Sequence, residues 1–463
     1  MEIDQHPLTY LLHQNNWTAT QYLARLSTVH ERLGYGAIPP DRKRITRWTR
    51  HGTTPEPSAQ KAMAVLHNIP QSEVADRPWP AWLSLACMGP RDLLHARWTP
   101  QAAIELLDHA AAVGGLMDRQ GMDRRGFVIV AGLAPVLAQA ATAPLAPART
   151  TGSRIGASVP ALFEQSLAIL RRQDDQFGSG QVHASARAQL ALITKQLKTA
   201  SYTEATGRRL YAAAAEAARI CAWTAYDSGQ HALAEEHYLV ALRAAASSGD
   251  PVVTANTLAF WAIMRYSTAD ANGAVDLVNG ALGYTRQIGS ARMEAMLLAR
   301  LARAHAHAGD SQAAAHAQNA AMAAYDRARD QDTAADPDCV YWLNLGEIRM
   351  LQGSCSLNLG RPKEAISHFE GASAGLSTAD TYREDEYPRG AAIYLAREAE
   401  ARIALDDLDG AIDTAHRAVD HMGGITSARS TSTLADLRSK FTARREVPIV
   451  REFLESTAYV GAA

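Results

Sequence analysis

Apolar residues recur with the period of amphipathic helices from Ala161 to the C-terminus, and the alternation typical of strands is almost absent. Short loops that contain Gly, Pro or Asp, such as DSGQ, HAGD and LGRP, interrupt these helical stretches. Farther upstream, residues 1–85 also divide into short helical segments bounded by Gly and Pro. The pattern predicts an all-α fold for the whole chain.

Five segments after residue 225 repeat one another and can be stacked without gaps: DSGQHALAEEHYLVAL, TADANGAVDLVNGAL, HAGDSQAAAHAQNAA, NLGRPKEAISHFEGA and ALDDLDGAIDTAHRA. Stacking aligns two columns of small residues, which are Ala234, Ala274, Ala314, Ala365 and Ala411, and then Ala241, Ala281, Ala321, Ala372 and Ala418. Small side chains allow antiparallel helices to approach closely, and neighbouring pairs can then dock on the same ridge. The repeats predict stacked helical hairpins; an irregular Ala-rich bundle is the alternative.

This pattern resembles the tetratricopeptide repeat, whose minimal unit is about 34 residues. The repeats are separated here by 40, 40, 51 and 46 residues, so helices or loops must be longer than in that unit. The resemblance implies an α-solenoid of tetratricopeptide-like hairpins whose first helices line a concave face.

The N-terminal region predicts three helices in close succession. The first runs from Leu8 to about Asn15, and the second starts at Thr18, where Gln21 three residues later completes a capping box. The turn LGYGAIPP follows, since Gly and Pro do not continue a helix. Asp41 is placed to cap a third helix, DRKRITRWTRHG, that ends at Gly52.

The third helix combines an apolar side with a basic one. Ile45 and Trp48 are three residues apart and are expected to anchor it to its domain. Its polar and basic residues are Arg42, Lys43, Arg44, Thr46, Arg47 and Arg50. A short helix of this kind suits the DNA major groove, where arginine contacts guanine edges or phosphates. The alternative is a solvated basic helix without a partner.

Net charge supports only a local attraction to nucleic acid. The 463-residue chain carries 46 basic and 48 acidic side chains, a net charge of -2. Residues 1–85 hold nine basic and seven acidic side chains, a net of +2, so any affinity for polyanions lies near the N-terminus.

The runs NWTATQYLARL and RITRWTRHGTTPEP are similar to the Xre-type helix-turn-helix of bacterial repressors, and SAQKAMAVLHNIP looks like its closing helices. LRRQDDQFGSG (170–180), DRRGF and the stretch 222–251 resemble a large actinobacterial group that joins such a reader to tetratricopeptide-like repeats. About sixteen residues separate Ala24 from Asp41, where the usual turn has three or four. Either the second helix extends to around Leu33, or an insertion displaces the recognition helix. The residues expected to bind DNA are Gln21, Arg42, Lys43, Arg44, Thr46, Arg47 and Arg50.

The chain is expected to divide into a helix-turn-helix DNA-binding domain (1–85), a connecting helix and linker (86–160), and a repeat domain for sensing and dimerisation (161–463). Whether the connecting part is a distinct domain or a hinge is open. It contains a helix pattern from Pro100 to Val113 and an apolar stretch (123–143) that looks like a twin-arginine export signal. Such signals act at the N-terminus, so a linker or packed helix is expected and the protein is placed in the cytoplasm.

Counting back from the aligned alanines places Glu216, Arg219, Trp223, Tyr226, Asn256, Tyr266, Arg303 and His307 on the concave face. Six of them are predicted to bind a ligand: Arg219, Trp223, Tyr226, Asn256, Tyr266 and Arg303. Asn can bridge to a peptide bond, Arg can take a carboxylate, and rings can form pockets. The resemblance to peptide-responsive regulators of the RRNPP type implies the same groove; the alternative is that these aromatic residues belong to the core.

We expect neither catalytic activity nor a metal or cofactor site, because the sequence lacks the motifs that indicate them. It has no P-loop, GxGxxG, HExxH or GxSxG element, and its four cysteines form no CxxC pair. The predicted function is a homodimeric transcription regulator that binds double-stranded DNA and senses a peptide, a small ligand or a partner protein in the repeat groove. Two alternatives remain: a repeat scaffold with a vestigial DNA-binding domain, and a membrane-attached or exported protein. The operator, the signal and the direction of regulation are open.

Overall fold

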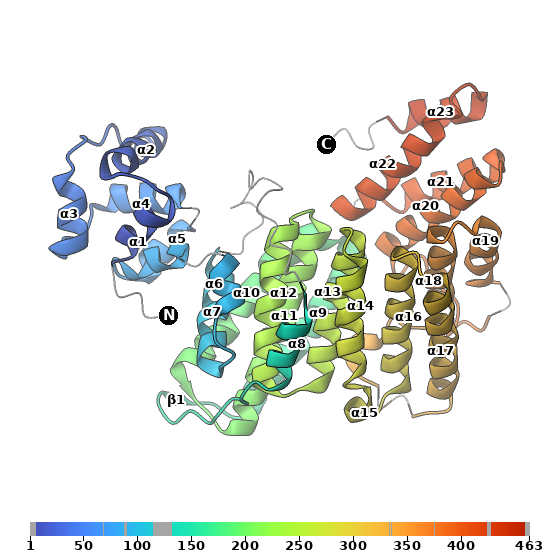
Figure 1. The fold of residues 1–463 in the computed structure, drawn as a ribbon, viewed down its shortest axis with the longest axis horizontal. Helices are drawn as coiled ribbons and strands as arrows, with labels where there is room; N and C mark the ends of the chain where they lie inside the picture. Colours follow the sequence, from blue (N-terminus) through green and yellow to red (C-terminus); the bar gives the residue numbers. More distant parts are fainter. Residues whose placement is uncertain are drawn as a thin grey trace.

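A computed structural model describes residues 6–458, apart from 68, 88–89, 114–131, 333, 335, 375 and 424–426. The described chain is all-helical except for one pair of two-residue strands. Figure 1 shows a small N-terminal group of helices beside a long row of roughly parallel helices that ends at the C-terminus. The all-α prediction is therefore confirmed.

The N-terminal group consists of α1 (Pro7–Gln14), α2 (Ala19–Arg32), α3 (Lys43–Arg50), α4 (Pro57–Leu66), α5 (Gln71–Asp76) and the 3-10 helix η1 (Ala81–Cys87). The capping box at the start of α2 is confirmed, because the Thr18 hydroxyl accepts from the Gln21 N–H and the Gln21 side chain accepts from the Thr18 N–H. The helices surround a core in which Tyr22, Leu23 and Trp82 are almost fully buried.

The connecting part contains α6 (Pro90–His95), α7 (Pro100–Val113) and α8 (Ala134–Ala141). Helix α7 packs against helices α10 and α12 of the repeat region, and Leu107 lies fully buried in their common core. In the linker-like stretch, β1 (Ser153–Arg154) pairs in parallel with β2 (Ala200–Ser201). Of the export-like stretch 123–143, residues 123–131 lie outside the described residues, and α8 packs on α12 and α14.

The remaining helices form pairs along the chain. They are α9 (Ser158–Phe177), α10 (Ser179–Thr199), α11 (Glu204–Asp227), α12 (His231–Ser248), α13 (Pro251–Ser267), α14 (Ala271–Leu282), α15 (Thr285–Ile288), α16 (Ala291–His307), α17 (Ser311–Arg329), the 3-10 helix η5 (Asp338–Val340), α18 (Leu345–Asn358), α19 (Pro362–Gly371), α20 (Pro388–Ala404), α21 (Leu408–Asp420), α22 (Ala428–Thr442) and α23 (Pro448–Ser456). Besides the contacts inside each pair, the first helices contact one another in the order α11, α13, α16, α18, α20 and α22.

Both columns of alanines in the sequence repeat lie at the helix contacts. The first column occupies the fourth position of α12, α14, α17, α19 and α21, and the second follows two turns later. All ten alanines are at most 1% exposed. Because a methyl group is the whole side chain, the helix backbones can approach closely at these positions.

The turn between the two helices of each pair also repeats. One residue adopts a left-handed backbone two positions before the second helix, at Gly229, Ala269, Gly309, Gly360 and Asp406. The N–H of the next residue bonds to the carbonyl five positions earlier, as from Asp270 to Arg265, at 2.8–3.0 Å in the five turns. This geometry satisfies carbonyls at the end of the first helix and reverses the chain.

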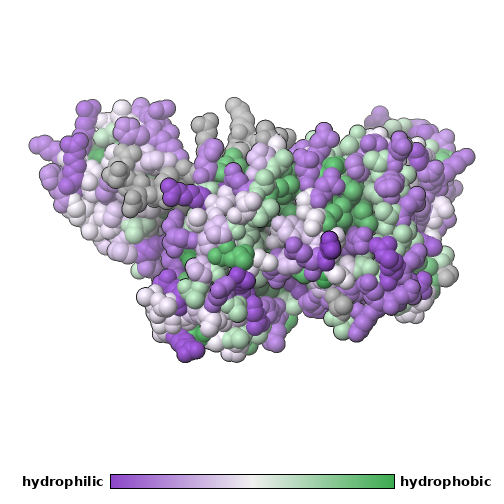
Figure 2. All heavy atoms as spheres, turned by 60° about the horizontal axis from the view of Figure 1, so that its bottom comes forward, coloured by the Kyte–Doolittle hydropathy of each residue, from purple (hydrophilic) through white to green (hydrophobic). Residues whose placement is uncertain are grey.

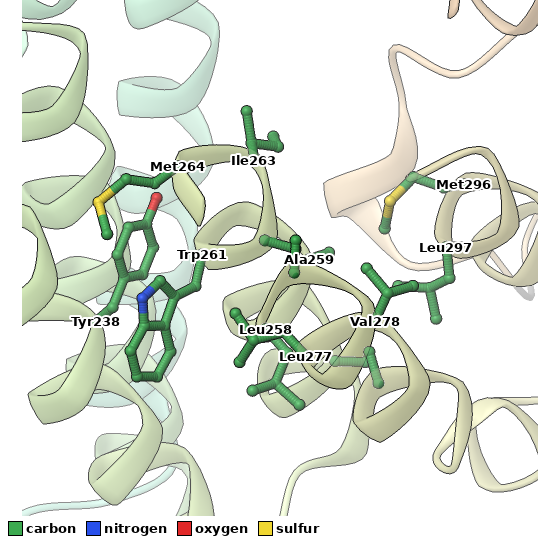
Figure 3. Packing of buried hydrophobic residues seen from close by; sticks show 14 of the residues in the cluster. Tyr238, Leu258, Ala259, Trp261, Ile263, Met264, Leu277, Val278, Met296 and Leu297 are labelled. Atoms are coloured by element: carbon green, nitrogen blue, oxygen red, sulfur yellow. The ribbon is translucent and has the colours of Figure 1, made fainter. Parts of the chain in front are cut away.

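Larger side chains fill the space between the pairs. Figure 3 shows Tyr238 and Trp261 packed side by side, with Leu277 and Val278 of α14 extending the same cluster toward Met296 and Leu297 of α16. The Tyr238 and Trp261 rings stack with centroids 5.9 Å apart. One continuous apolar cluster therefore joins several helix pairs.

The repeat exceeds the minimal unit because first helices such as α13 and α16, with 17 residues each, are long. Two inserted segments make the spacing unequal. Segments 330–344 and 372–387, the first of which contains η5, lie between successive pairs. None of the helices in the described ranges has the combination of length and apolarity that crossing a membrane requires.

Candidate functional site

A cavity of about 640 Å³ follows the inner side of the helix row. Most of its wall is formed by α9 and by the first helix of each later pair, which are α11, α13, α16, α18, α20 and α22, and connecting segments such as 339–342 complete it. The six residues predicted to bind a ligand all line this cavity, namely Arg219, Trp223, Tyr226, Asn256, Tyr266 and Arg303. The structure thus brings together side chains that are up to 84 positions apart in the chain.

The aromatic members of this set lie mostly in the wall. Trp223, Tyr226 and Tyr266 are each less than 9% exposed. Trp223 meets Phe260 edge to face with centroids 5.0 Å apart, and Tyr266 stacks on His307 at 4.9 Å. These rings serve the core, as the alternative interpretation expects, and also present part of their surface to the cavity.

Positive charge on the α9–α11 side is compensated by carboxylates. Both oxygens of Glu216 accept from Arg219, and Arg171 adds a bond of 2.8 Å. Burial favours the neutral carboxyl, but the two guanidinium groups outweigh it and lower the pKa of Glu216 to about 2. The guanidinium group of Arg219, predicted to bind a ligand carboxylate, is therefore already occupied by Glu216.

A second buried ion pair joins distant parts of the chain across the cavity. Arg389 of α20 donates to Asp174 of α9 at 2.7 Å, although 215 positions separate them. Asp174 also accepts from the Trp223 indole N–H and from the Ser179 hydroxyl, both at 2.8 Å. Burial opposes ionisation, yet these partners lower the pKa of Asp174 below its ordinary value. The pair holds α20 against α9.

The C-terminal helices close the same side of the cavity. Ser427, at the start of α22, donates to the buried carboxylate of Asp227 at 3.0 Å. The guanidinium group of Arg429 lies over the Trp223 ring, 4.9 Å from its centroid. These contacts place the last helix pair beside the first helices of the row.

The wall around Arg300, Arg303 and Arg397 differs, because these three lining arginines form no ion pair within the described ranges. Arg303 and Arg397 both donate to one atom, the Oδ1 of Asn358, and neither forms an ion pair within the described ranges. Arg303 also donates to His307, at 3.1 Å, if that ring is neutral. Burial, and then repulsion from both arginines, lowers the pKa of His307 to about 3, so the neutral ring is the stable form.

Burial and the charge of Arg303 also lower the pKa of Arg397, to about 10. The guanidinium carbon of the third arginine, Arg300, lies 5.2 Å from the centroid of the Trp342 ring, and Arg300 forms no ion pair with the residues described. The acidic wall residue Glu347 accepts from the Tyr394 hydroxyl at 2.6 Å, and burial raises the pKa of its carboxyl against the opposing charge of Arg300. The charge of this end is therefore positive.

Six buried polar atoms of wall residues have no hydrogen-bond partner in the described part of the chain, and four of them are guanidinium nitrogens of Arg171, Arg300, Arg397 and Arg429. The other two are the Oδ1 of Asn256 and the Oγ of Ser354, whose residues are 2% and 1% exposed. Both residues line the cavity. An unpaired buried polar group is costly, and most such groups have a partner in native proteins.

The predicted DNA-binding helix forms a second candidate site. Ile45 and Trp48 are buried in the N-terminal core, while Thr46, Arg47 and Arg50 are exposed and Arg44 is half-buried. Figure 2 shows hydrophilic side chains at the left-hand tip of the molecule, the end at which α3 lies in Figure 1. The predicted apolar anchor and open basic side of this helix are therefore both present.

Most of these cations lie at the surface, and two of them have partners there. Arg47 pairs with Asp41 at 3.1 Å, with 54% and 43% of the two side chains exposed, and Arg42 donates to Thr20. Asp41 also accepts from the Lys43 N–H at 2.9 Å, so it caps the helix start one residue before the assigned N-cap. Gln21 is exposed but engaged in its capping box.

The long turn before α3 is ordered by its own contacts. Helix α2 extends to Arg32, as the first of the two alternatives expects, and residues 33–42 form the remaining turn. Ile38 is buried and its N–H bonds to the Ser27 hydroxyl at 3.0 Å, while the carbonyl of Gly36 lies 2.6 Å from the His30 ring nitrogen. The extra residues thus pack against α2.

Several cavity residues have no counterpart among the sequence predictions. They come from α9, from the segment after η5 and from α18, α20 and α22: Arg171, Asp174, Asp175, Tyr341, Trp342, Glu347, Arg389, Tyr394, Arg397 and Arg429. The run LRRQDDQFGSG contains three of them, and counting back from Ala365 and Ala411 would have located those of α18 and α20. The position of α9 has no such signal.

The cysteines and the possible metal ligands of the described residues form no further candidate site. All four cysteines are buried, and burial raises the pKa of Cys221 and of Cys339 to about 12, which keeps these thiols protonated. Among the residues described, no three His, Cys, Asp or Glu side chains are arranged to hold a metal ion.

No protein-family model matches the chain, and no curated protein has a significant sequence match to it.

Proposed function

We propose that this chain is a ligand-responsive transcription regulator of the cytoplasm that binds double-stranded DNA. In this proposal α1–α5 form a helix-turn-helix unit similar to the Xre type, with α3 as the recognition helix. Helices α9–α23 form a tetratricopeptide-like α-solenoid whose cavity holds a peptide, a small ligand or a segment of a partner protein. The observation that carries the proposal is α3 itself, since Ile45 and Trp48 anchor it while Arg47 and Arg50 remain exposed.

Contacts between the two parts support coupling of the cavity to the DNA-binding unit. Arg77, between α5 and η1, pairs with Asp108 of α7 at 2.7 Å, and Lys198 of α10 binds the same carboxylate at 2.9 Å. Helix α7 packs on α12, which packs on the cavity helix α11. A ligand that favours one arrangement of these helices would change the population of DNA-binding conformers.

A two-fold dimer fits this function, because repressors with this kind of reader bind two half-sites. Three large apolar side chains on α9, namely Leu162, Ile169 and Phe177, are 65%, 57% and 52% exposed. Single exposed apolar residues are ordinary, but three along one helix indicate a surface that another protein chain covers. We assign this side of α9 to the dimer interface.

A gel-shift titration with the DNA upstream of the protein's own gene tests the proposal. The variant Arg44→Ala/Arg47→Ala is expected to bind at least tenfold more weakly, because two cations leave the DNA-facing side. If both contact phosphates, the slope of log K against log salt becomes shallower by about 2. Lys61→Ala, which removes an exposed cation of α4, serves as the matched control and keeps wild-type affinity.

Genome-wide mapping of binding sites extends this test to operators other than the protein's own. Absence of salt-sensitive binding in both assays, or equal binding by the double variant and the wild type, contradicts the DNA-binding function. The helix row would then be a protein-interaction scaffold with a vestigial reader.

A further inference from the structure

The cavity wall has an uneven distribution of charge. Seven arginines line it in the described part of the chain, and those on the α9–α11 side are paired with carboxylates such as Glu216 and Asp174. On the opposite side, Arg303 of α16 and Arg397 of α20 have no ion pair within the described ranges. A negative charge brought by a ligand would therefore be most stable between α16 and α20.

The two guanidinium groups are held close together although both are cationic. One amide oxygen, Oδ1 of Asn358, accepts from both, and Arg397 also donates to the backbone carbonyl of Ser354 at 3.2 Å. Fixed side chains of like charge in a buried wall repel each other unless an anion lies between them. Their planar forks are also suited to hold two oxygens of one carboxylate or phosphate group.

Unsatisfied atoms in the same wall provide an independent indication of a ligand. The hydroxyl of Ser354, on the residue whose carbonyl binds Arg397, has no hydrogen-bond partner among the residues described and can donate to an anion. Farther along, on α13, the Oδ1 of Asn256 lacks a donor. A ligand with an anionic group at one end and a hydrogen-bond donor elsewhere would satisfy both.

We propose that the side of the cavity formed by Arg303 and Arg397 is the binding site for the anionic group of the ligand, a carboxylate or a phosphate. The Ser354 hydroxyl donates to the same group, and the body of the ligand lies against the aromatic wall toward Asn256. This inference rests on the proposed function in one respect only, namely that the cavity is the sensor. It adds the chemical class of the signal, an organic anion.

The test uses the full chain with inorganic phosphate and with malonate, each compared with chloride at the same ionic strength. Binding stabilises the folded protein by RT ln(1 + [L]/Kd), and at a concentration ten times Kd the thermal midpoint of a chain of this length rises by about 1.5 °C. Tryptophan fluorescence gives a second readout, because two of the eight tryptophans, Trp223 and Trp342, lie in the cavity wall. A shift with phosphate alone assigns a phosphate ligand, with malonate alone a carboxylate ligand, and with both a shared anion site.

The variants Arg303→Gln and Arg397→Gln are expected to bind the probe at least tenfold more weakly. Arg397→Gln should also keep or raise the midpoint of the ligand-free protein, since it removes a half-buried cation that forms no ion pair within the described ranges. A structural role would lower the midpoint. If Arg397→Gln does not fold, Arg397→Lys is used in its place, because it keeps the positive charge but loses the planar guanidinium group. Arg402→Gln is the control, because Arg402 lies on the same helix, pairs with Glu398 and does not line the cavity.

Equal midpoints in phosphate, malonate and chloride, or wild-type affinity in both Gln variants, would overturn the inference. Neither readout depends on DNA. Loss of the anion effect with intact gel shifts therefore rejects this site alone, whereas anion binding without any gel shift rejects the regulator and retains the site.

Discussion

Ala269 and Asp406 adopt the left-handed backbone that three other repeats give to glycine, at Gly229, Gly309 and Gly360. In this region a Cβ atom lies too close to the neighbouring carbonyl oxygen, so an L-residue costs about 1–2 kcal/mol more than in an ordinary conformation. The turn geometry is kept nevertheless, because the same hydrogen bond from the next N–H is present in all five repeats. Helix pairing therefore determines the backbone at these turns.

Replacing Ala269 by Gly should stabilise the protein by about 1 kcal/mol, since relief of the left-handed backbone exceeds the added entropy of the unfolded chain. The reverse change at the equivalent position, Gly309→Ala, should destabilise it by about 1 kcal/mol. No atom lies within 4 Å of the Cβ that this change adds, so only the backbone conformation is affected. Urea unfolding followed by circular dichroism measures both changes, and shifts of the same sign would contradict this account.

At the scale of the element, the second helix of each pair depends on small residues at two fixed positions. Ala314 of α17 is fully buried in a cluster with Ala302 and Ala306 of α16 and with Cys355 of α18. Three helices therefore share this small cluster. A larger side chain there would have to separate them.

We expect Ala314→Leu to lower the free energy of unfolding by about 1–3 kcal/mol, the usual cost of overpacking a close helix contact. The control is Ala315→Leu on the next, exposed position of the same helix, where a change within about 0.5 kcal/mol is expected. Denaturant midpoints of the two variants provide the comparison. Equal destabilisation by both would show that helix propensity, rather than packing, accounts for the alanine column.

At the scale of the whole molecule, the helix row bends so that its end meets its beginning. Arg389 pairs with Asp174, and Ser427 bonds to Asp227. Both contacts are buried, and removal of one partner from a buried ion pair such as Arg389–Asp174 costs about 3–5 kcal/mol. The cavity therefore has walls from both ends of the row, and its shape depends on the sum of all the helix crossings.

The outer side of α9 gives the prediction for the assembled molecule. Ile169→Lys places a charge in the apolar strip that we assign to the dimer interface, so light scattering should show a monomer where the wild type is a dimer. Leu405→Lys is the control, because Leu405 is an exposed apolar residue at the end of α20, away from that strip. A wild-type monomer, or an Ile169→Lys dimer, would contradict this interface.

Local features of the chain were predictable from the sequence because each depends on neighbouring residues. The capping box of Thr18 and Gln21, the burial of Ile45 and Trp48, and the ten aligned alanines all agree with the structure. The limits of α7, Pro100–Val113, agree to the residue. Helical periodicity and capping act within one or two turns, so the residues themselves contain the necessary information.

Only the tertiary structure decides how α9, the segment after η5 and α18–α22 complete the cavity. Asp174 and Arg389 are 215 positions apart, and Arg303 and Arg397 meet at Asn358 of a third helix. These contacts depend on the accumulated curvature of stacked helix pairs, to which every crossing angle contributes a little. The sequence alone therefore identifies the lining of the early helices, and the curvature determines which distant residues face it.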